Sequence, residues 1–176
     1  MTRIYITDLE AYNNGHLIGE WYEFPMNTKL LAESVEDVLR EGKMICEDEH
    51  FHEEYFITDY ESDIFKIDEY EDIFKLNEKV KLIDELDEDS KKSIRFLIDN
   101  NLVNDFEEAL ERREDVIIHE EMSMEDIAYE FVTECYNLDE LAPIIANNID
   151  YSQIGREIEM DGRHFVEGNT IFEYLG

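Results

Sequence analysis

Residues 4–24 read IYITDLEAYNNGHLIGEWYEF and decide how the first part of the chain folds. Residues 4–6 and 18–24 are rich in β-branched and aromatic side chains, which favour β-strands. Asn13-Asn14-Gly15, which lies between them, is a strong turn signal. The stretch therefore predicts two strands joined by a turn, at the start of a β-rich lobe.

Helical and strand patterns alternate beyond this stretch. The S/T-x-x-D/E form that begins at Ser34, with Gly42 as a C-terminal cap, predicts a helix of about eight residues. Residues 55–58 predict a third strand. From Ser62 to about residue 113 the apolar side chains (Ile67, Tyr70 and Phe74 first) follow a helical period, which indicates two or three short amphipathic helices. Two of these helices are expected to begin with caps at residues 87–90 and at Asn104.

The last part of the chain mixes both patterns. Ser123 has the form of a helix start, and Ile127, Phe131 and Cys135 follow on one face of that helix. A further helix is predicted over residues 150–159, and strands over residues 116–118, 163–166 and 170–174. We therefore expect an elongated α+β fold of three small consecutive lobes. These are a β-rich N-terminal lobe (1–61), a central helical bundle (62–104) and a mixed α/β C-terminal lobe (105–176).

Negative charge dominates the composition. The 176 residues include 47 Asp and Glu against 15 Lys and Arg, a formal net charge of −32. Because 43% of the residues are hydrophobic and 12% aromatic, the chain differs from disordered acidic sequences. Duplex DNA carries one negative charge per roughly 1.7 Å of axis, so the chain holds the charge of about 16 base pairs. Such a surface repels nucleic acid and anionic membranes and attracts basic proteins.

The acidic residues are spread over structured segments rather than gathered in a tail. Glu107, Glu111 and Glu114, like Glu121 and Glu125, have the spacing that places carboxylates roughly 5–6 Å apart on one helix face. This spacing favours a surface that imitates phosphates, while a solvated helix face of an acidic or halophilic protein is the alternative. The residues expected to form the acidic surface are Glu47, Asp48, Glu49, Glu53, Glu54, Asp59, Glu61, Asp63, Asp68, Glu69, Glu71, Asp72, Asp84, Glu85, Glu88, Glu107, Glu111, Glu114, Asp115, Glu121 and Glu125.

Motifs for catalysis or for metal binding do not emerge from the sequence. His50 and His52 are the best metal candidates, but a structural site needs a cysteine or a third histidine at a fixed spacing. We therefore interpret both as exposed histidines in an acidic loop. His119 and His164 have no nucleophile context such as GxSxG, and neither a phosphate loop nor an EF-hand loop is present. The sequence predicts no enzyme activity, no catalytic residue, no metal and no cofactor.

The cysteine and hydropathy patterns bear on the compartment. Cys46 and Cys135 are isolated, which is typical of a reducing compartment. No stretch approaches eighteen apolar residues, so no transmembrane helix is expected. The chain is therefore predicted to be cytoplasmic.

Three motifs resemble those of one family. Tyr12-Asn13-Asn14-Gly15-x-Leu17-x-Gly19-x-Trp21 resembles the N-terminal motif of the ArdA family of antirestriction proteins. Residues 55–61 are similar to its aromatic–acidic stretch that ends in Asp-Tyr-Glu. Leu138-x2-Leu-Ala-Pro143, followed by Asp150-Tyr151 and by Arg156-Glu157-Ile158, resembles its antirestriction motif. These similarities run from near residue 4 to near residue 166.

The resemblance implies a homodimer that mimics bent B-form DNA. Such a protein occupies the DNA-binding groove of type I restriction–modification enzymes, at the methyltransferase core, and protects incoming mobile DNA in a bacterial host cell. It binds neither nucleic acid nor membrane. The alternative is an acidic chaperone-like or Ca²⁺-binding protein for a basic partner.

In the family, the antirestriction segment is associated with the dimer contact. The same apolar run is also typical of an ordinary buried helix. One departure is that Asn147-Asn148-Ile149 stands where aromatic residues are expected. The residues that correspond to the segment here are Leu138, Leu141, Ala142, Pro143, Ile144, Ile145, Asp150, Tyr151 and Arg156.

Overall fold

The computed structural model describes residues 1–46 and 51–176. They form a mixed α+β fold, as the sequence predicts. The chain divides into two compact units, Met1–Leu86 and Asp87–Gly176.

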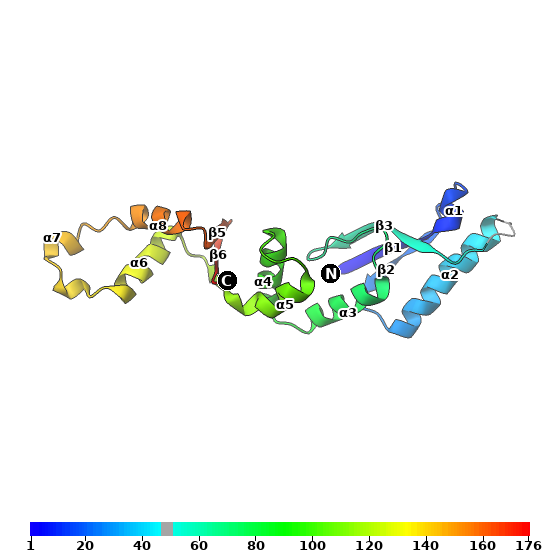
Figure 1. Ribbon diagram of the computed structural model, residues 1–176, viewed down its shortest axis with the longest axis horizontal. Coiled ribbons are helices and arrows are strands. Elements are labelled where there is room, and N and C mark those ends of the chain that lie inside the picture. Colours follow the sequence, from blue (N-terminus) through cyan, green and yellow to red (C-terminus); the bar gives the residue numbers. More distant parts are fainter. Residues whose placement is uncertain (47–50) are drawn as a thin grey trace. The chain divides into compact units, whose positions relative to one another are not determined.

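In the first unit an antiparallel three-stranded sheet with the order β2-β1-β3 packs against α2 and α3 (Figure 1). Successive residues of a strand point to opposite faces, so Ile4 and Ile6 of β1 both enter the core, which also contains Leu31 of α2 and Leu76 of α3. The elements are β1 (Thr2–Asp8), α1 (Leu9–Asn13), β2 (Gly19–Phe24), α2 (Thr28–Cys46), β3 (Tyr55–Ser62) and α3 (Ile73–Asp84). The three strands predicted in this part of the chain are confirmed.

Helix α2 is longer than the sequence predicts, and both of its expected ends are wrong. It begins at Thr28 rather than near Ser34, because Asn27 Oδ1 accepts hydrogen bonds from the amides of Lys29 (2.9 Å) and Leu30 (3.4 Å). It continues through Gly42 to Cys46, so Gly42 is not a cap.

Gly42 lies inside the helix because a buried carboxylate occupies the space beside it. A Cβ at this position would be 2.0 Å from Asp8 Oδ2. Asp8 is completely buried, its Oδ1 accepts a hydrogen bond from the Ala11 amide (2.9 Å), and its Oδ2 lies 2.5 Å from His52 Nδ1. The His52 side chain is 1% exposed, so its interpretation as an exposed loop histidine is wrong. One carboxylate thus joins β1, α1, α2 and the segment before β3.

Residues 62–72 are not helical, although their apolar pattern predicts a helix. Asp72 Oδ1 accepts hydrogen bonds from the amides of Phe74 and Lys75 and so begins α3 at Ile73. The amide of Ile57 on β3 donates to the Glu69 carbonyl (2.8 Å), which fixes the preceding segment along the sheet.

The second unit contains another antiparallel sheet, with the order β4-β6-β5. Phe96 of α4 stacks on Phe172 of β6, with ring centroids 4.5 Å apart, and meets Phe165 of β5 edge-on at 5.1 Å. The elements are α4 (Glu88–Asp99), α5 (Phe106–Arg112), η1 (Arg113–Asp115), β4 (Val116–Glu120), α6 (Met124–Cys135), η2 (Leu138–Glu140), α7 (Pro143–Ala146), α8 (Tyr151–Met160), β5 (His164–Glu167) and β6 (Thr170–Tyr174). The predicted strands of this part are confirmed.

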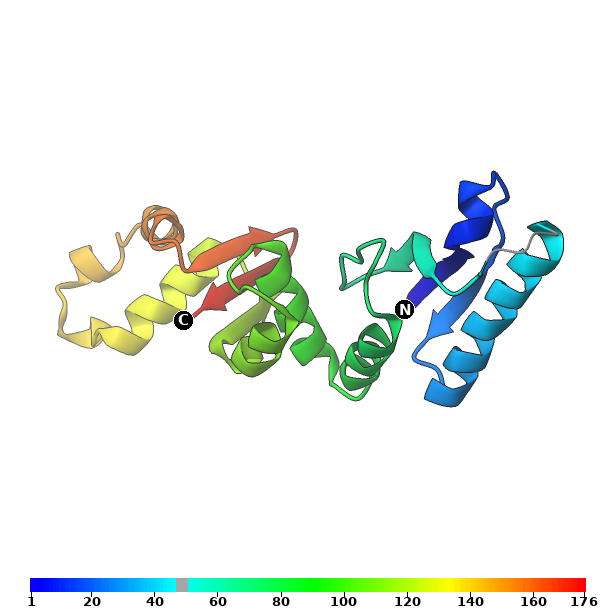
Figure 2. The ribbon, with the colours of Figure 1, turned by 45° about the vertical axis from the view of Figure 1, so that its right-hand side comes forward.

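Helices α6 and α8 lie side by side (Figures 1 and 2). Gly155 makes their close approach possible, because a Cβ there would be 2.4 Å from the Met124 carbonyl oxygen. The start of α6 at Ser123 is confirmed as a capping box with Asp126. The start of α4 is likewise confirmed, with Asp87 as its cap.

The cap of α5 is one residue later than predicted. Asp105 rather than Asn104 accepts the hydrogen bond from the Glu108 amide (2.8 Å). Because Asp87 opens the second unit, the boundary between the units falls within residues 62–104, the segment predicted as one helical lobe. Helix α3 belongs to the first unit and α4 to the second.

Candidate functional site

The acidic side chains expected to form a functional surface lie on the outside of both units. Glu71 and Asp115 are half-buried, and Glu47, Asp48 and Glu49 lie outside the described residues, as does His50. The other members of the set are all exposed: Glu53, Glu54, Asp59, Glu61, Asp63, Asp68, Glu69, Asp72, Asp84, Glu85, Glu88, Glu107, Glu111, Glu114, Glu121 and Glu125.

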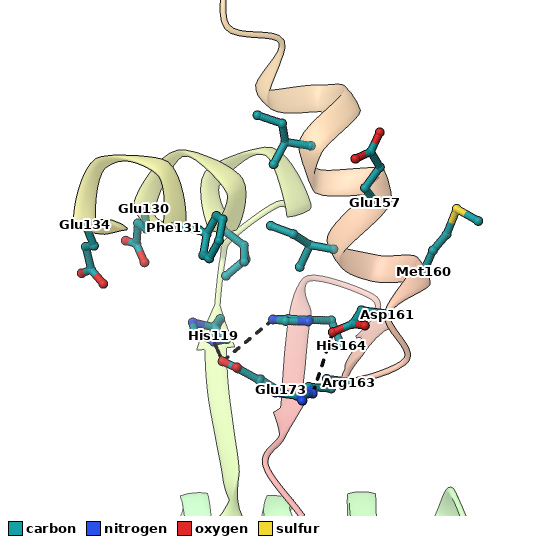
Figure 3. A pocket seen from close by; sticks show the side chains of 13 residues that line it. His119, Glu130, Phe131, Glu134, Glu157, Met160, Asp161, Arg163, His164 and Glu173 are labelled. Carbon is teal, nitrogen blue, oxygen red and sulfur yellow. Dashed lines mark hydrogen bonds and ion pairs between the residues drawn. The ribbon is translucent and has the colours of Figure 1, made fainter. Parts of the chain in front are cut away.

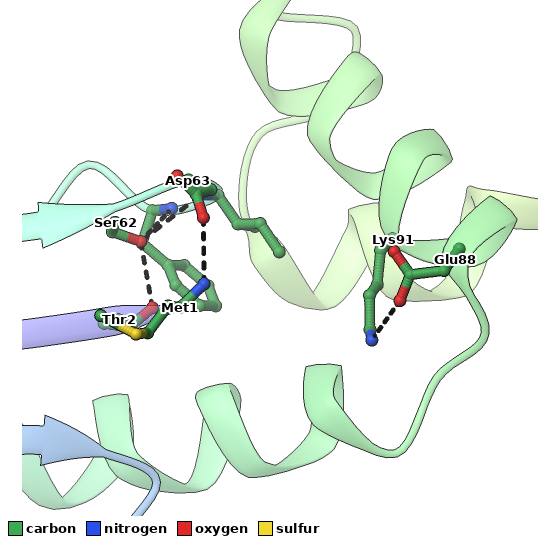
Figure 4. A network of polar contacts seen from close by, with 8 residues as sticks. Met1, Thr2, Ser62, Asp63, Glu88 and Lys91 are labelled. Carbon is green, nitrogen blue, oxygen red and sulfur yellow. Dashed lines mark hydrogen bonds and ion pairs between the residues drawn. The ribbon is translucent and has the colours of Figure 1, made fainter.

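Cations lie beside some of these carboxylates (Figure 4). Asp63 Oδ2 is 3.0 Å from the amino group of Met1, and Glu88 Oε1 accepts a hydrogen bond from Lys91 Nζ (2.8 Å). Such exposed pairs contribute little to stability. Fifteen Lys and Arg cannot neutralise 47 Asp and Glu one for one, so a large excess of negative charge faces the solvent.

Hydrogen bonds hold several carboxylates in their ionised form. The backbone amide of Ser90 holds the pKa of Asp87 below its ordinary value. The backbone amide of Asn104 does the same for the pKa of Glu108, and the Lys91 ammonium lowers the pKa of Glu88. Because a lowered pKa means that the charged form persists to lower pH, these acids stay negative in mildly acidic solution.

The predicted helical spacing of carboxylates is correct in one place and wrong in another. Glu107 and Glu111 both lie on α5, four residues apart, and Glu114 follows on η1. Glu121 and Glu125 do not share a helix. Glu121 lies in a turn with φ of +57°, two residues before the Ser123 cap, and only Glu125 is helical.

The apolar segment with the antirestriction-like motif is not a buried helix. It forms η2 and α7, and Leu141 is 39%, Ile144 76% and Ile145 57% exposed. Contiguous exposed apolar side chains are typical of an interaction surface. Ala142 and Pro143 are exposed as well, while Leu138 is half-buried.

The polar part of the same motif organises α8. Asp150 Oδ1 accepts a hydrogen bond from the Gln153 amide (2.9 Å) and so caps the helix. Tyr151 packs edge-on against Tyr129 of α6, with ring centroids 5.2 Å apart. Arg156 donates to Gln153 Oε1 (2.7 Å) on its own helix, so it orders the exposed face of α8.

A groove of about 750 Å³ lies between α6, α8 and the second sheet (Figure 3). Phe131 of α6 and Ile158 of α8 line its apolar part, and polar side chains come from both helices, from the segment after α8 and from all three strands. His119 Nε2 and His164 Nε2 lie 3.4 and 3.9 Å from the same atom, Glu173 Oε2. Burial lowers the pKa of His164, partly opposed by Glu173.

The sequence shows no nucleophile context for His119 and His164, which are 45 positions apart in the numbering, and does not predict their proximity. Strand pairing brings them together: His164 lies opposite Glu173, and His119 lies opposite Ile171 on the same strand. The period-2 pattern of the two strands is the signal that would have placed these side chains on one face.

A metal-binding arrangement is not found within residues 1–46 and 51–176. No group of three or more His, Cys, Asp or Glu side chains there could hold a metal ion. No helix in the same part of the chain is long and apolar enough to cross a membrane.

A family model matches nearly the whole chain. The model of the family described as antirestriction protein (ArdA) matches residues 4–173. No curated protein matches the chain.

Proposed function

The chain belongs to the ArdA family of antirestriction proteins, and we propose that it acts as an acidic, dimeric mimic of bent B-form DNA. In this role it occupies the DNA-binding groove of type I restriction–modification enzymes, at the methyltransferase core, and excludes DNA by competition. The inhibition is stoichiometric and not catalytic. Its consequence is protection of incoming mobile DNA in the cytoplasm of a bacterial host.

The observation that supports this proposal most directly is the exposed excess of carboxylates on both folded units. A groove that binds DNA neutralises phosphates with Lys and Arg, and the release of counterions supplies much of its affinity. An ordered polyanion can satisfy the same cations. Because its carboxylates are carried by packed helices and strands, it loses less conformational freedom on binding than a flexible acidic chain would.

The exposed apolar segment supports dimerisation. Leu141, Ile144 and Ile145 are solvent-exposed in the single chain, and association of two copies through this segment would remove them from water. Two chains together carry the charge of about 32 base pairs by the count of one charge per roughly 1.7 Å of duplex axis.

Competition for a type I methyltransferase core tests the proposal. Labelled duplex DNA is bound to the enzyme core, and the purified protein is added at two salt concentrations. At salt concentrations at which the protein is dimeric, we expect stoichiometric displacement that weakens as salt rises further, because attraction between opposite charges is screened. Failure to displace DNA at low salt, by a protein that is folded and dimeric, would refute DNA mimicry and point to another basic partner.

Matched variants separate the proposed surface from net charge alone. One variant replaces Glu53, Glu54 and Asp68 with Lys, and the other replaces Glu33, Glu36 and Glu41 of α2 with Lys. All six side chains are exposed, and both variants change the net charge equally. Only the first set belongs to the surface proposed here, so we expect it to lose more inhibition. Equal losses would show that total charge, rather than this surface, determines binding.

A further inference from the structure

Aromatic side chains lie on the face of the first sheet that is turned away from the core. Tyr5 at the centre of β1 lies opposite Trp21 of β2 and opposite Asp59 of β3. The Tyr5 and Trp21 rings meet edge-on with centroids 5.5 Å apart. Since Ile4 and Ile6 point into the core, Tyr5 points to the opposite face.

Gly19 fixes the position of the Tyr5 ring. The Tyr5 hydroxyl donates a hydrogen bond to the Gly19 carbonyl (2.8 Å). A Cβ at Gly19 would lie 2.8 Å from Tyr5 Cε1 and 2.3 Å from the Ile6 carbonyl oxygen, so no other residue fits without displacement. The Gly-x-Trp part of the N-terminal motif therefore builds a specific aromatic surface.

This surface is hollowed into an open groove of about 540 Å³. Tyr12 meets Phe56 edge-on, with centroids 5.1 Å apart, and is 50% exposed. These rings and the exposed carboxylates of Asp59 and Glu69 give the groove apolar walls and a negative rim. The lining includes Tyr5, Tyr12, Trp21, Phe56, Asp59 and Glu69.

The same sheet face already holds one guanidinium. Arg3 Cζ lies 4.5 Å from the centre of the Trp21 ring, and Arg3 Nε is 3.5 Å from Glu61 Oε2. A cation is attracted to an aromatic face by the ring quadrupole and to the neighbouring carboxylate by its charge. The groove presents to the solvent the same two kinds of group that surround Arg3, an aromatic ring and a carboxylate.

We propose that this groove, here called the aromatic groove, binds an arginine side chain of the basic protein partner. Guanidinium is planar and weakly hydrated, so it stacks on aromatic rings better than the strongly hydrated lysine ammonium does. The partner's arginine inserts beside Tyr12 and Phe56 and places its charge near Glu69 or Asp59.

The proposal rests on the proposed function because it assumes a basic protein partner. It adds one contact of defined geometry to binding by the collective charge of the acidic surface. Contact with the rings depends on close packing rather than on long-range attraction. We therefore expect the arginine contact to be less sensitive to salt than the rest of the acidic surface.

Short peptides test the aromatic groove without the enzyme. The probes are acetyl-Gly-Arg-Gly-Arg-Gly-amide and the same peptide with Lys in place of Arg, which has equal charge. Trp21 is the only tryptophan of the chain and lines the groove, so its fluorescence reports occupancy. We expect the arginine peptide to bind roughly 3- to 10-fold tighter than the lysine peptide.

Three substitutions test whether the aromatic groove causes the preference for the arginine peptide. Tyr12→Ala and Glu69→Gln should each reduce it, whereas Tyr12→Phe, which keeps the ring, should retain it. Glu41→Gln removes another exposed carboxylate, on α2, and is the matched control, which should leave the preference unchanged. Equal binding of the two peptides, or a preference that survives both Tyr12→Ala and Glu69→Gln, would overturn the proposal.

The outcome is independent of the competition assay. A chain that prefers the arginine peptide but fails to displace DNA supports the aromatic groove and refutes DNA mimicry. A chain that displaces DNA but binds both peptides equally supports DNA mimicry and refutes the aromatic groove.

Discussion

Replacing Gly42 with Ala should destabilise the first unit, although the same change usually strengthens a helix. Helix propensity alone favours Ala by about 1 kcal/mol. Here the new Cβ would lie 2.0 Å from Asp8 Oδ2 and 2.7 Å from Asp8 Cγ. If the carboxylate stays in place, overpacking costs about 1–3 kcal/mol, and an overlap this deep belongs at the upper end of that range.

The carboxylate has no inexpensive way to move aside. Leaving its position would remove the cap on the Ala11 amide, which is worth about 1 kcal/mol. It would also break the contact between Asp8 Oδ2 and His52 Nδ1, and the loss of a hydrogen bond to a charged group costs about 1.5–3 kcal/mol. After subtraction of the gain in helix propensity, we expect Gly42→Ala to lose about 2 kcal/mol.

Urea unfolding followed by the fluorescence of Trp21, which belongs to the same unit, measures this loss. The exposed neighbour Glu41→Ala is the control for helix propensity and should change stability little. In a background of Asp8→Ala most of the cost of Gly42→Ala should disappear, because only the Cβ of residue 8, at 3.1 Å, remains close to the new methyl group. A Gly42→Ala protein as stable as the unchanged chain, or more stable, would refute the reasoning.

Three further predictions concern single side chains. Asn77→Ala should destabilise the first unit by about 2–4 kcal/mol in the same urea assay, because Asn77 pairs with both the amide (2.8 Å) and the carbonyl (2.9 Å) of Met26. Ser123→Ala should cost about 1 kcal/mol in thermal unfolding followed by helical circular dichroism, since it removes the cap of α6. Burial raises the pKa of Tyr22 from 10.0 to about 12. Tyr22 therefore stabilises the fold fully below pH 10 and loses that contribution as pH rises towards 12, a loss that stability measurements should not show for Tyr22→Phe.

The sequence predicted those parts of the fold that depend on neighbouring residues. Asp87 and Ser123 accept hydrogen bonds from amides within three residues, so their capping roles could be recognised from short patterns. Ser34 has the same kind of pattern but lies inside α2. The position at which α2 begins depends on Asn27, whose side chain accepts hydrogen bonds from the first amides of the helix. No cap at Ser34 is then needed.

Contacts between distant residues limited the rest of the prediction. The role of Gly42 depends on Asp8, which lies on another element. The exposed acids could be predicted because ionised carboxylates are too costly to bury in number. The aromatic groove could not be placed, because the pairing of Tyr5 with Asp59 depends on a strand register that is irregular between Tyr5 and Ile6.

Salt should act in opposite directions on the two associations that we propose. Each chain carries a net charge of −32, so two copies repel one another, and screening by salt relieves that repulsion. The apolar contact through Ile144 and Ile145 is not weakened by the same ions. Binding to a basic DNA groove depends on attraction, which screening reduces. If two paired chains bind the enzyme better than one, inhibition should pass through a maximum at intermediate salt, where the chain is dimeric and attraction persists. A steady fall in inhibition from the lowest salt, with sedimentation showing the dimer forming only as salt rises, would mean that a single chain is the inhibitory form.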